Sequence, residues 1–518
     1  MNKLSSAFYY EELPSFKSEE IGRLYSDRVS KEQKKILGQF FTSAKVARFM
    51  VSLLDVGFDK KTIKILDPGC GLLSLTCALI ERIINENTKI KKIEVDAFDT
   101  DADIESLVYD IIKLLVDYGQ KRGVKVIVNY SCSDFLISNK GYFNKEFNEP
   151  VYDCIISNPP YFKLKKEDER VSIFDTDLQG QQNIYSLFLM GASKLLKRRG
   201  QLVFIVPRSF TSGLYFQSFQ NSFLKEIEIQ YFHLFNSRTD GFKRDKVLQE
   251  NIILKAIPRN KKKLSKVKIS YSQGVNDLGL SKGKEFSHNE LFKKIGKLNI
   301  IHLPVNELEE KAMNLFSLWT NNLGSFGMKV STGPVVPHRC KEQLEHKKPK
   351  NSNYVPLIWM HNCFKMKLEW PKKKVSKEAW IQNGNLSNSK TIESKNYIFL
   401  RRFSSKDDKS KLVATPHVKD SLKYKMIGIE NHLNYLYKSD GELELEEVYG
   451  LSVLYNSSIF DAYFRSLSGN TQVNATELNA IPLPSLQIIK DIGFQYISLK
   501  TKNIKEIDII VNKTFKIF

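Results

Sequence analysis

An amide side chain, two prolines and an aromatic ring follow a short apolar segment in the first half of the sequence. Residues 151–156 are mostly apolar and include β-branched side chains, which predicts a buried strand. The loop that follows contains Asn158, Pro159, Pro160 and Tyr161. Proline fixes its own φ and disfavours helix at the residue before it, so this loop is expected to be stiff. It would hold the side-chain oxygen of Asn158 and the carbonyl of Pro159 as two fixed hydrogen-bond acceptors beside a ring.

A second group of polar residues precedes this loop, and each member lies at the end of a predicted strand. The carboxylates are Asp67, Asp99 and Asp134. Gly69 and Gly71 follow the first of them, and glycines let a ligand approach the backbone closely. In dinucleotide-type folds, an acid at the end of the second strand bonds ribose hydroxyls. Ser74 stands where such motifs have a third glycine, which disfavours a nicotinamide cofactor and favours one without a phosphate.

Apolar and amphipathic segments alternate from about residue 64 to residue 256, and these elements must position the polar residues. The predicted strands are Lys64–Leu66, Glu94–Phe98, Lys125–Asn129, Tyr152–Ile156, Gln201–Val206, Ile227–Leu234 and Asn251–Ala256. The predicted helices are Leu72–Asn85 and Ile184–Lys197. This alternation indicates an α/β fold with a mostly parallel, doubly wound, Rossmann-like sheet. Ligands of such sheets bind beyond the carboxyl ends of the strands, where the carboxylates and the Asn158 loop are expected to meet.

Length and composition set further bounds. The chain has 518 residues, enough for two or three domains. Its net charge of +21 favours a polyanionic partner but does not distinguish DNA from RNA. Six scattered cysteines without a Cys-x-x-Cys pair indicate a reducing cytoplasm and disfavour a zinc site. No apolar window has the roughly 18 residues of a membrane helix, and the N-terminal residues lack the features of a secretory signal.

The order of these motifs resembles that of the S-adenosylmethionine-dependent adenine-specific DNA methyltransferases of restriction-modification systems. The likeness is to the gamma-ordered class of the TaqI and Eco57I methylases, and it covers most of the chain. Gly38-Gln-Phe-Phe-Thr42 resembles the family's N-terminal cofactor motif. Asp67-Pro-Gly-Cys-Gly71 resembles its Asp-Pro-Ala-Cys-Gly-Ser-Gly motif, with Leu72-Leu73 replacing the last two residues. Asn158-Pro-Pro-Tyr161 is the family's catalytic motif without change.

The resemblance implies S-adenosylmethionine as the cofactor and a set of residues that bind it. These residues are Gln39, Phe40, Thr42, Asp67, Gly69, Gly71, Asp99, Asp134 and Phe188. Within this set, Asp99 would bind the ribose and Asp134 the adenine of the cofactor. Phe188, in a segment that resembles the family's next helix, would cover the cofactor's adenine. No metal is implied.

The resemblance further implies methyl transfer to the exocyclic N6 amine of an adenine in duplex DNA. The catalytic residues would be Asn158, Pro159, Pro160 and Tyr161. An acceptor on each amine hydrogen frees a lone pair that is otherwise delocalised into the ring. The target base must be extruded from the duplex, which costs a few kcal/mol. Tyr161 and Phe242 would stack on its two faces, at roughly 1–3 kcal/mol per stacked base.

The C-terminal half resembles the family's target-recognition domain. Residues 1–300 are expected to form the catalytic domain, with a helical extension over residues 1–36, and residues 301–518 the recognition domain. The second domain lacks a βαβ pattern and is predicted to be mixed α+β, with short strands at Tyr354–Met360, Asn396–Phe403 and Tyr424–Ile429. The residues implied to bind DNA are Arg401, Arg402, Lys406, Asn470 and Gln472. The cations among them are more often phosphate contacts than base readers.

Other hypotheses stay open at the level of the sequence. An RNA or protein-glutamine N-methyltransferase would also suit an Asn-Pro-Pro-Tyr loop, although such enzymes resemble the first half alone. A non-catalytic DNA-binding specificity protein would not need Asp67, Asp99 and Asn158 together. A fused restriction nuclease lacks a convincing acidic-lysine cluster, and asparagine before the prolines favours adenine over cytosine. The expected partners are double-stranded DNA and, where the system has one, a separate cognate restriction endonuclease, with the chain monomeric in a bacterial or archaeal cytoplasm.

Overall fold

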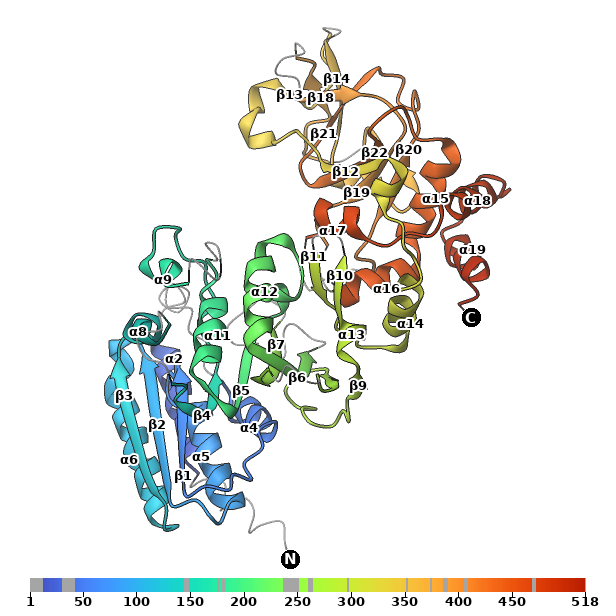
Figure 1. Cartoon of the computed structure of the whole chain (residues 1–518). Helices are drawn as coiled ribbons and strands as arrows, with labels where there is room; N and C mark the ends of the chain where they lie inside the picture. The colour runs from blue at the N-terminus through green and yellow to red at the C-terminus, as the bar shows by residue number, and fades with distance from the viewer. Residues whose placement is uncertain are drawn as a thin grey trace, which may run out of the picture. The chain divides into compact units, whose positions relative to one another are not determined.

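The computed structural model divides the chain into two compact units, Met1–Lys293 and Lys294–Phe518 (Figure 1). The boundary expected from the sequence was residue 300. The structure does not describe residues 1–12, 30–41, 144–148, 175–177, 179–181, 236–250, 260–263, 296–297, 351–352, 373–374, 385–389, 405–408, 468–471 and 518. Each unit has its own sheets and its own hydrophobic core.

A nine-stranded sheet in the order β3-β2-β1-β4-β5-β7-β6-β8-β9 forms the centre of the first unit. Its strands are β1 (Thr62–Pro68), β2 (Lys92–Asp99), β3 (Lys125–Cys132), β4 (Tyr152–Ser157), β5 (Leu196–Pro207), β6 (Ile227–Phe235), β7 (Asn251–Pro258), β8 (Val267–Ser272) and β9 (Lys284–Phe286). β7 runs antiparallel to β5 and β6, and β9 runs antiparallel to β8. The remaining pairs are parallel. The predicted α/β fold with a mostly parallel sheet is confirmed, and the sequence did not predict β8 and β9.

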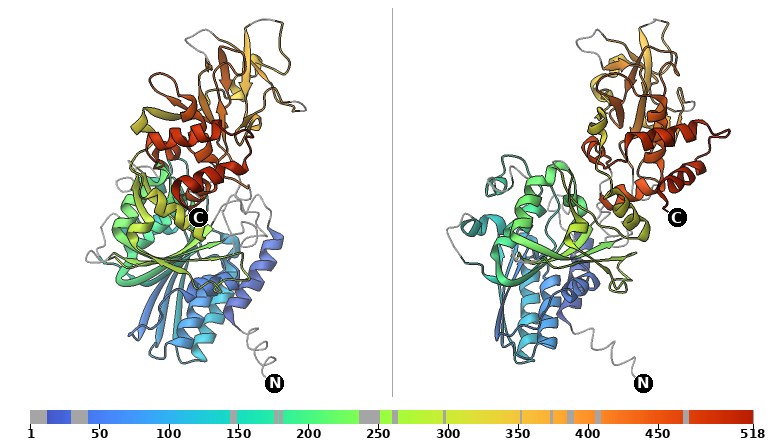
Figure 2. Two further views of the ribbon diagram at one scale, coloured as in Figure 1. Left: turned by 90° about the vertical axis from the view of Figure 1, so that its right-hand side faces the viewer. Right: turned by 45° about the vertical axis from the view of Figure 1, so that its right-hand side comes forward.

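Helices cover both faces of this sheet (Figure 2). They are α2 (Pro14–Arg28), α4 (Ala44–Ser52), α5 (Ser74–Glu86), α6 (Glu105–Gln120), α7 (Phe135–Ser138), α8 (Lys140–Phe143), α9 (Glu169–Ser172), α11 (Ile184–Leu195), α12 (Gln217–Glu226) and α13 (His288–Leu291). α2, α4, α5 and α6 share one core cluster with the sheet, and α11 and α12 pack together along β5 and β6. The two predicted helices correspond to α5 and α11.

Residue types explain why these elements form. All six residues of β4 are buried, so this strand needs cover on both faces, as a parallel sheet with helices on each side provides. Each fully buried aliphatic side chain, such as Ile65 or Leu79, contributes roughly 1.5–3 kcal/mol. α2 is tied to α5 through Ser15, whose backbone N and Oγ donate to Glu81 Oε1 and Oε2 at 2.6 and 2.9 Å. Ser18 Oγ donates to Leu72 O at 2.6 Å, which also anchors this N-terminal helix.

The second unit combines short strands with a group of helices. Its strands are β10 (Phe292–Ile295, which crosses the boundary), β11 (Leu298–Ile301), β12 (Met328–Thr332), β13 (Leu344–Glu345), β14 (Tyr354–Ile358), β15 (Cys363–Phe364), β16 (Lys367–Leu368), β17 (Trp380–Gln382), β18 (Thr391–Glu393), β19 (Tyr397–Arg401), β20 (Ala414–His417), β21 (Met426–Ile429) and β22 (Leu433–Lys438). Its helices are α14 (Glu307–Phe316), α15 (Leu445–Asn456), α16 (Ser458–Leu467), α17 (Ala475–Ala480), α18 (Leu486–Ile497) and α19 (Lys505–Phe515). The two larger sheets have the orders β12-β22-β19-β20 and β13-β17-β14-β21-β18. The predicted strands of this region correspond to β14, β19 and β21.

Two glycines set the packing of α15 against α18. A Cβ at Gly450 would lie 1.9 Å from Ile489 O, and a Cβ at Gly493 would lie 2.0 Å from Glu446 O. Both distances are far below van der Waals contact, so only glycine allows this approach of the two backbones. The helices bury a cluster with α16 and β19, which gives the second unit its core.

Candidate active site

Neighbouring parallel strands bring predicted site residues to one edge of the first unit's sheet. β2, β1 and β4 are adjacent, and Pro68 of β1 lies in register with Phe98 of β2. Ser157 Oγ donates to Pro68 O at 2.8 Å, which ties the end of β4 to the end of β1. We call the group formed by Asp67, Gly69, Gly71, Asp99 and Asn158 the strand-end site.

The glycine loop after β1 is fixed to the end of β2. The backbone N–H groups of Gly69 and Cys70 both donate to Phe98 O at 2.8 Å. Gly71 N donates to Asp99 Oδ2 at 2.8 Å. Gly69 and Gly71 have φ values of +96° and +48°, and the first lies in a region that is essentially restricted to glycine. Leu73, in the departure from the family motif, adopts φ +59° and is fully buried, so α5 begins at Ser74.

Asp67 is a buried carboxyl beneath this loop. Its side chain is 0 % exposed, and Thr76 Oγ1 donates to Oδ2 at 2.7 Å. Oδ1 has no hydrogen-bond partner among the described residues. Burial, with a smaller contribution from the charge of Asp99, raises the pKa of Asp67 to about 7, and the hydrogen bonds from Thr76 oppose this rise. Burial also raises the pKa of Asp99, so the acids at this edge lose their protons less readily than exposed carboxyls.

The carboxamide of Asn158 is held by two side chains. Its Nδ2 donates to Thr42 Oγ1 at 3.1 Å. The hydroxyl of Tyr161 donates to Asn158 Oδ1 at 2.5 Å and also lies 2.8 Å from Ile205 O on β5. Since Thr42 takes the amide nitrogen, the amide oxygen faces Tyr161, and the carboxamide has a fixed direction at the end of β4.

The prolines of the loop lie beside the glycine loop and an aromatic ring. A Cβ placed on Gly69 would lie 3.7 Å from Pro160 Cδ, 3.9 Å from Pro159 Cα and 3.5 Å from Phe188 Cε1. Phe188 is buried on α11, and its ring centroid is 5.3 Å from that of Phe135. The structure therefore brings together the glycine loop, the Asn-Pro-Pro-Tyr loop and the Phe188 helix, which are up to 119 residues apart in the sequence (Gly69 to Phe188).

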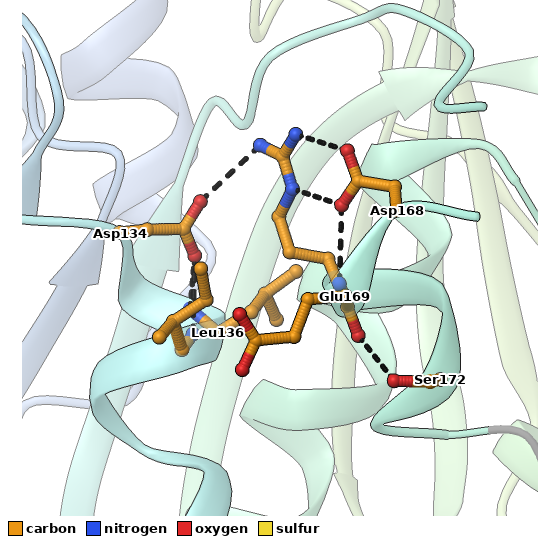
Figure 3. Close-up of polar contacts among 7 residues, drawn as sticks. Asp134, Leu136, Asp168, Glu169 and Ser172 are labelled. Carbon is orange, nitrogen blue, oxygen red and sulfur yellow. Dashed lines mark hydrogen bonds and ion pairs between the residues drawn. The ribbon is translucent and has the colours of Figure 1, made fainter.

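Asp134 lies just beyond β3 and already has several partners (Figure 3). Leu136 N and Ile137 N donate to its Oδ1 at 2.8 and 3.1 Å, so the side chain caps α7. Arg170 Nη1 pairs with Oδ2 at 3.3 Å, while Nε and Nη2 of the same guanidinium bind Asp168 at 2.7 and 2.6 Å. The adenine-binding role of Asp134 stays a prediction, and its Oδ2 is shared with a cation that the sequence did not single out.

The recognition residues of the second unit that the structure describes do not share one environment. Arg401, at the end of β19, donates from Nε to Cys363 O at 2.7 Å. Arg402 donates from Nη1 to Asn431 O at 3.1 Å, and its backbone O accepts from Val473 N at 2.7 Å. The next residue, Phe403, forms a bridge with Gln472. The structure thus places Gln472 near Arg402, and it gives Arg401 different partners.

Several predicted site residues fall outside the described part of the chain. They are Gln39, Phe40, Phe242, Lys406 and Asn470. Sequence reasoning missed Ser157 and Arg170, which fix the end of β4 and Asp134. Ser157 directly precedes the Asn-Pro-Pro-Tyr motif and could have been noted, whereas no motif marks Arg170.

The residues of the strand-end site fit S-adenosylmethionine. The loop backbone at Gly69 has no side chain between it and the Phe188 ring, and a Cβ would fill that space. Asp67 Oδ1 lacks a partner among the described residues, and Asp99 is an acceptor at the end of the second strand. Carboxyl groups beside a ring suit a ligand with a cationic end and an adenosine end.

The described residues contain neither a membrane-spanning helix nor a cluster of metal ligands. Along the described ranges, no helix is both long and apolar enough to span a membrane. In the same ranges, no three histidine, cysteine, aspartate or glutamate side chains gather in an arrangement that could hold a metal ion.

Comparison with known proteins agrees with this geometry. The family model described as "Eco57I restriction-modification methylase" matches residues 47–242. Type II methyltransferase M.PstI of Providencia stuartii is 32% identical over 486 residues, which cover 93% of each chain. Type II methyltransferase M.BsuBI of Bacillus subtilis is 31% identical over 485 residues, covering 92% of this chain and 93% of the relative.

Among solved structures, the cryo-EM structure of a DrdV–DNA complex aligns with a TM-score of 0.48 and 14% identity. The alignment covers 90% of this chain and 57% of that chain. The sequence relatives alone decide the family, because two of them match along nearly the whole chain. The chain belongs to the S-adenosylmethionine-dependent Type II methyltransferases of restriction-modification systems.

Proposed function

We propose that this chain methylates the N6 amine of an adenine extruded from duplex DNA, as the modification enzyme of a restriction-modification system. The observation that carries the proposal is the position of the Asn158 loop. It follows β4 at the edge where β1 and β2 end, and its prolines lie beside Gly69. An amine acceptor is thereby next to the backbone that would hold the methyl donor. We assign catalysis to the first unit and target recognition to the second.

The Asn158 loop can activate an amine by accepting both of its hydrogens. Asn158 Oδ1 is one acceptor, and the backbone carbonyl of Pro159 is the other. Thr42 Oγ1 accepts from Asn158 Nδ2 and so keeps the oxygen directed away from Thr42. Because these dipoles are already in place, they need no reorganisation during the reaction. The arrangement favours an sp²-attached amine, whose lone pair is delocalised until its hydrogens are held.

Residues of the glycine loop and of α11 would hold the cofactor. S-adenosylmethionine, when bound, supplies a methyl group on a sulfonium, which is activated for transfer. Asp67 and Asp99 would bind its cationic end and its ribose, and Phe188 would cover its adenine. A Cβ built on Gly69 would lie 3.7 Å from Pro160 Cδ, so the two halves of the site are neighbours, and this would place the methyl donor close to the amine.

Tyr161 would contact the extruded base. In the structure its hydroxyl is bound to Asn158 Oδ1 and lies close to Ile205 O, which fixes the ring next to the carboxamide. Stacking on this ring is worth roughly 1–3 kcal/mol, comparable to the few kcal/mol that extrusion costs. Phe242 on the other face of the base stays a prediction, as do monomeric action and a separate cognate restriction endonuclease.

Transfer of a labelled methyl group tests the proposal. The chain is incubated with radiolabelled S-adenosylmethionine and plasmid DNA, and the DNA is then digested to nucleosides. We expect the label in N6-methyladenine alone, at a defined sequence that modified-base sequencing identifies. Label in N4-methylcytosine would contradict the adenine assignment. Label transferred to RNA or to protein glutamine, with none in DNA, would contradict the substrate class.

A further inference from the structure

A pocket in the second unit is rich in cations, and of its lining residues only Arg401 was predicted from the sequence to bind DNA. Its volume is about 350 Å³. The residues that line it include Phe364, Lys365, Arg401, Phe403, Ser404, Lys409 and Lys411. No carboxylate is among the described residues that line it. We call it the basic pocket.

Two of the four cations of the basic pocket are held in place by the backbone around them. Arg401 Nε donates to Cys363 O at 2.7 Å, and its Cζ lies 5.5 Å from the centroid of the Phe364 ring. Lys365 Nζ donates to Asn456 O at 2.9 Å. Lys409 is exposed, whereas Lys411 is buried. Fixed cations lose less side-chain entropy when they bind an anion. The basic pocket is therefore suited to a specific anionic ligand rather than to bulk counterions.

Acids near the pocket are engaged by other donors. Asp461 Oδ1 accepts from Lys411 N at 2.5 Å and from Leu412 N at 3.0 Å, and its Oδ2 accepts from Arg465 Nε at 2.7 Å. Asp508 accepts from the backbone N and the Oγ of Ser458, both at 2.7 Å. These carboxylates serve the backbone turn at residue 411 and the start of α16, and their charges also act on Lys365. The pocket lining nevertheless has four cations and no carboxylate among the described residues, so a net positive charge faces a ligand.

A buried hydroxyl supplies a second, independent observation. Ser404 lines the basic pocket and is 8 % exposed, and its Oγ has no hydrogen-bond partner among the described residues. A buried polar atom without a partner carries a desolvation cost, and native structures contain few of them. An anionic oxygen in the pocket would accept from this hydroxyl and remove that cost.

The aromatic rings identify the anion's carrier. Phe364 and Phe403 line the same pocket as the four cations. An inorganic anion would gain nothing from two phenyl rings, whereas a deoxyribose beside its phosphate presents an apolar face to them. We propose that the basic pocket binds a sugar-phosphate unit of the DNA backbone, without reading its base. This inference rests on the proposed DNA substrate, and it assigns the pocket to positioning the duplex on the second unit.

Salt dependence of DNA binding tests the inference. The full chain and the variants Lys365→Gln and Lys409→Gln are titrated with a fluorescein-labelled duplex of mixed sequence, by anisotropy, over a series of NaCl concentrations. Losing one phosphate contact should weaken binding about three- to tenfold and reduce the slope of log K against log salt by roughly 0.9. The reduction should be the same for duplexes of different sequence. Lys409 is exposed, so its variant is expected to keep the thermal midpoint of the parent chain.

Lys367→Gln is the matched control. Lys367 lies on β16, in the β15–β16 hairpin that also contains Lys365, but it does not line the pocket. Its Nζ pairs with Glu369 at 2.6 Å. Its substitution removes the same charge and should leave the slope unchanged. An unchanged slope in both pocket variants, or a loss confined to one DNA sequence, would overturn the inference. So would variants that lose calorimetric binding of inorganic phosphate but retain DNA binding. Failure of the proposed function is distinct, because it would show as absent methyl transfer by the unmodified chain.

Discussion

The strand-end site of the first unit and the basic pocket of the second are built from opposite charges. The first contains carboxyls, Asp67 and Asp99, whose pKa values are raised by burial. The second contains lysines and Arg401, and backbone carbonyls fix Lys365 and Arg401. Backbone geometry defines the first site, since glycines with positive φ and a double proline set its walls. Long side chains define the second.

This difference separates two kinds of function. A site made from strand ends holds atoms in one geometry, and loss of one acceptor there should lower the rate of a reaction. A pocket of cations supplies attraction that depends on charge and salt, so loss of one lysine there should weaken binding evenly across sequences. Substitutions of Asp67, Gly69 or Asn158 in the strand-end site are therefore expected to change chemistry or cofactor binding, while DNA affinity is retained.

Replacing Asn158 with alanine gives the largest expected effect. The variant lacks one of two acceptors for the amine, so methyl transfer should fall roughly 100- to 1000-fold. Cofactor affinity should stay within about twofold, because Asn158 belongs to the loop after β4 and not to the glycine loop after β1 that would hold the cofactor. The measurements are initial rates of labelled methyl transfer and calorimetric titration with S-adenosylmethionine.

Asn129→Ala is its control. Asn129 is exposed on β3, where its Nδ2 donates to Asp96 at 2.8 Å. Full activity is expected in this variant. If the Asn158→Ala variant retained more than about a tenth of the parent rate of methyl transfer, Asn158 would not be an acceptor in the reaction.

Gly69→Ala should have the next largest effect. Gly69 has φ +96°, which costs an alanine about 1–3 kcal/mol, and the added Cβ would occupy the space beside Phe188. We expect cofactor affinity to fall roughly 10- to 100-fold, as measured by calorimetry. DNA affinity and its salt slope should not change, which sharpens the contrast with the basic pocket.

Gly123→Ala separates strain from function. Gly123 also has a positive φ, +71°, and a Cβ there would meet nothing within 4 Å. It should lower the thermal midpoint by a similar amount while leaving cofactor binding intact. Equal cofactor affinities in the two variants would mean that the Gly69 backbone does not face the cofactor.

The two sites also differ in how far the sequence predicts them. Asp67, Asp99 and Asn158 follow apolar strands, and parallel strands must end at the same edge, so short motifs suffice to predict the strand-end site. The strand ends and α5 could be predicted because local periodicity of apolar residues indicates where strands and helices lie. The basic pocket joins residues from 364 to 504. The resemblance predicted only Arg401 of its cations to bind DNA, because no local motif brings Lys365, Lys409 and Lys411 together with it. The role of Arg170 was also not predicted, because its ion pair with Asp134 depends on how α9 packs.

The smallest expected effect is the pH dependence of stability that the ionisation of Asp67 causes. It distinguishes the buried acids of the strand-end site from the cations of the basic pocket. The folded-state pKa, about 7, is above the ordinary value of 3.8, because burial disfavours the charged carboxylate. Its contribution to stability is therefore fully present below pH 3.8 and is lost as the pH rises to about 7. Asp67→Asn removes the ionisation, and the amide can still accept from Thr76 Oγ1.

The difference in the free energy of unfolding between Asp67→Asn and the parent chain should therefore shift by about 1.4 kcal/mol in favour of the variant between about pH 6 and about pH 8. Urea denaturation of the cofactor-free chain at the two pH values measures this shift. Lys409→Gln is the comparison, since Lys409 is exposed in the second unit and its substitution should show no shift. If the Asp67 variant behaves as Lys409→Gln does, the carboxyl ionises as it would in water. The strand-end site would then be open to solvent like the basic pocket, and the contrast between a desolvated catalytic edge and a solvated binding surface would be wrong.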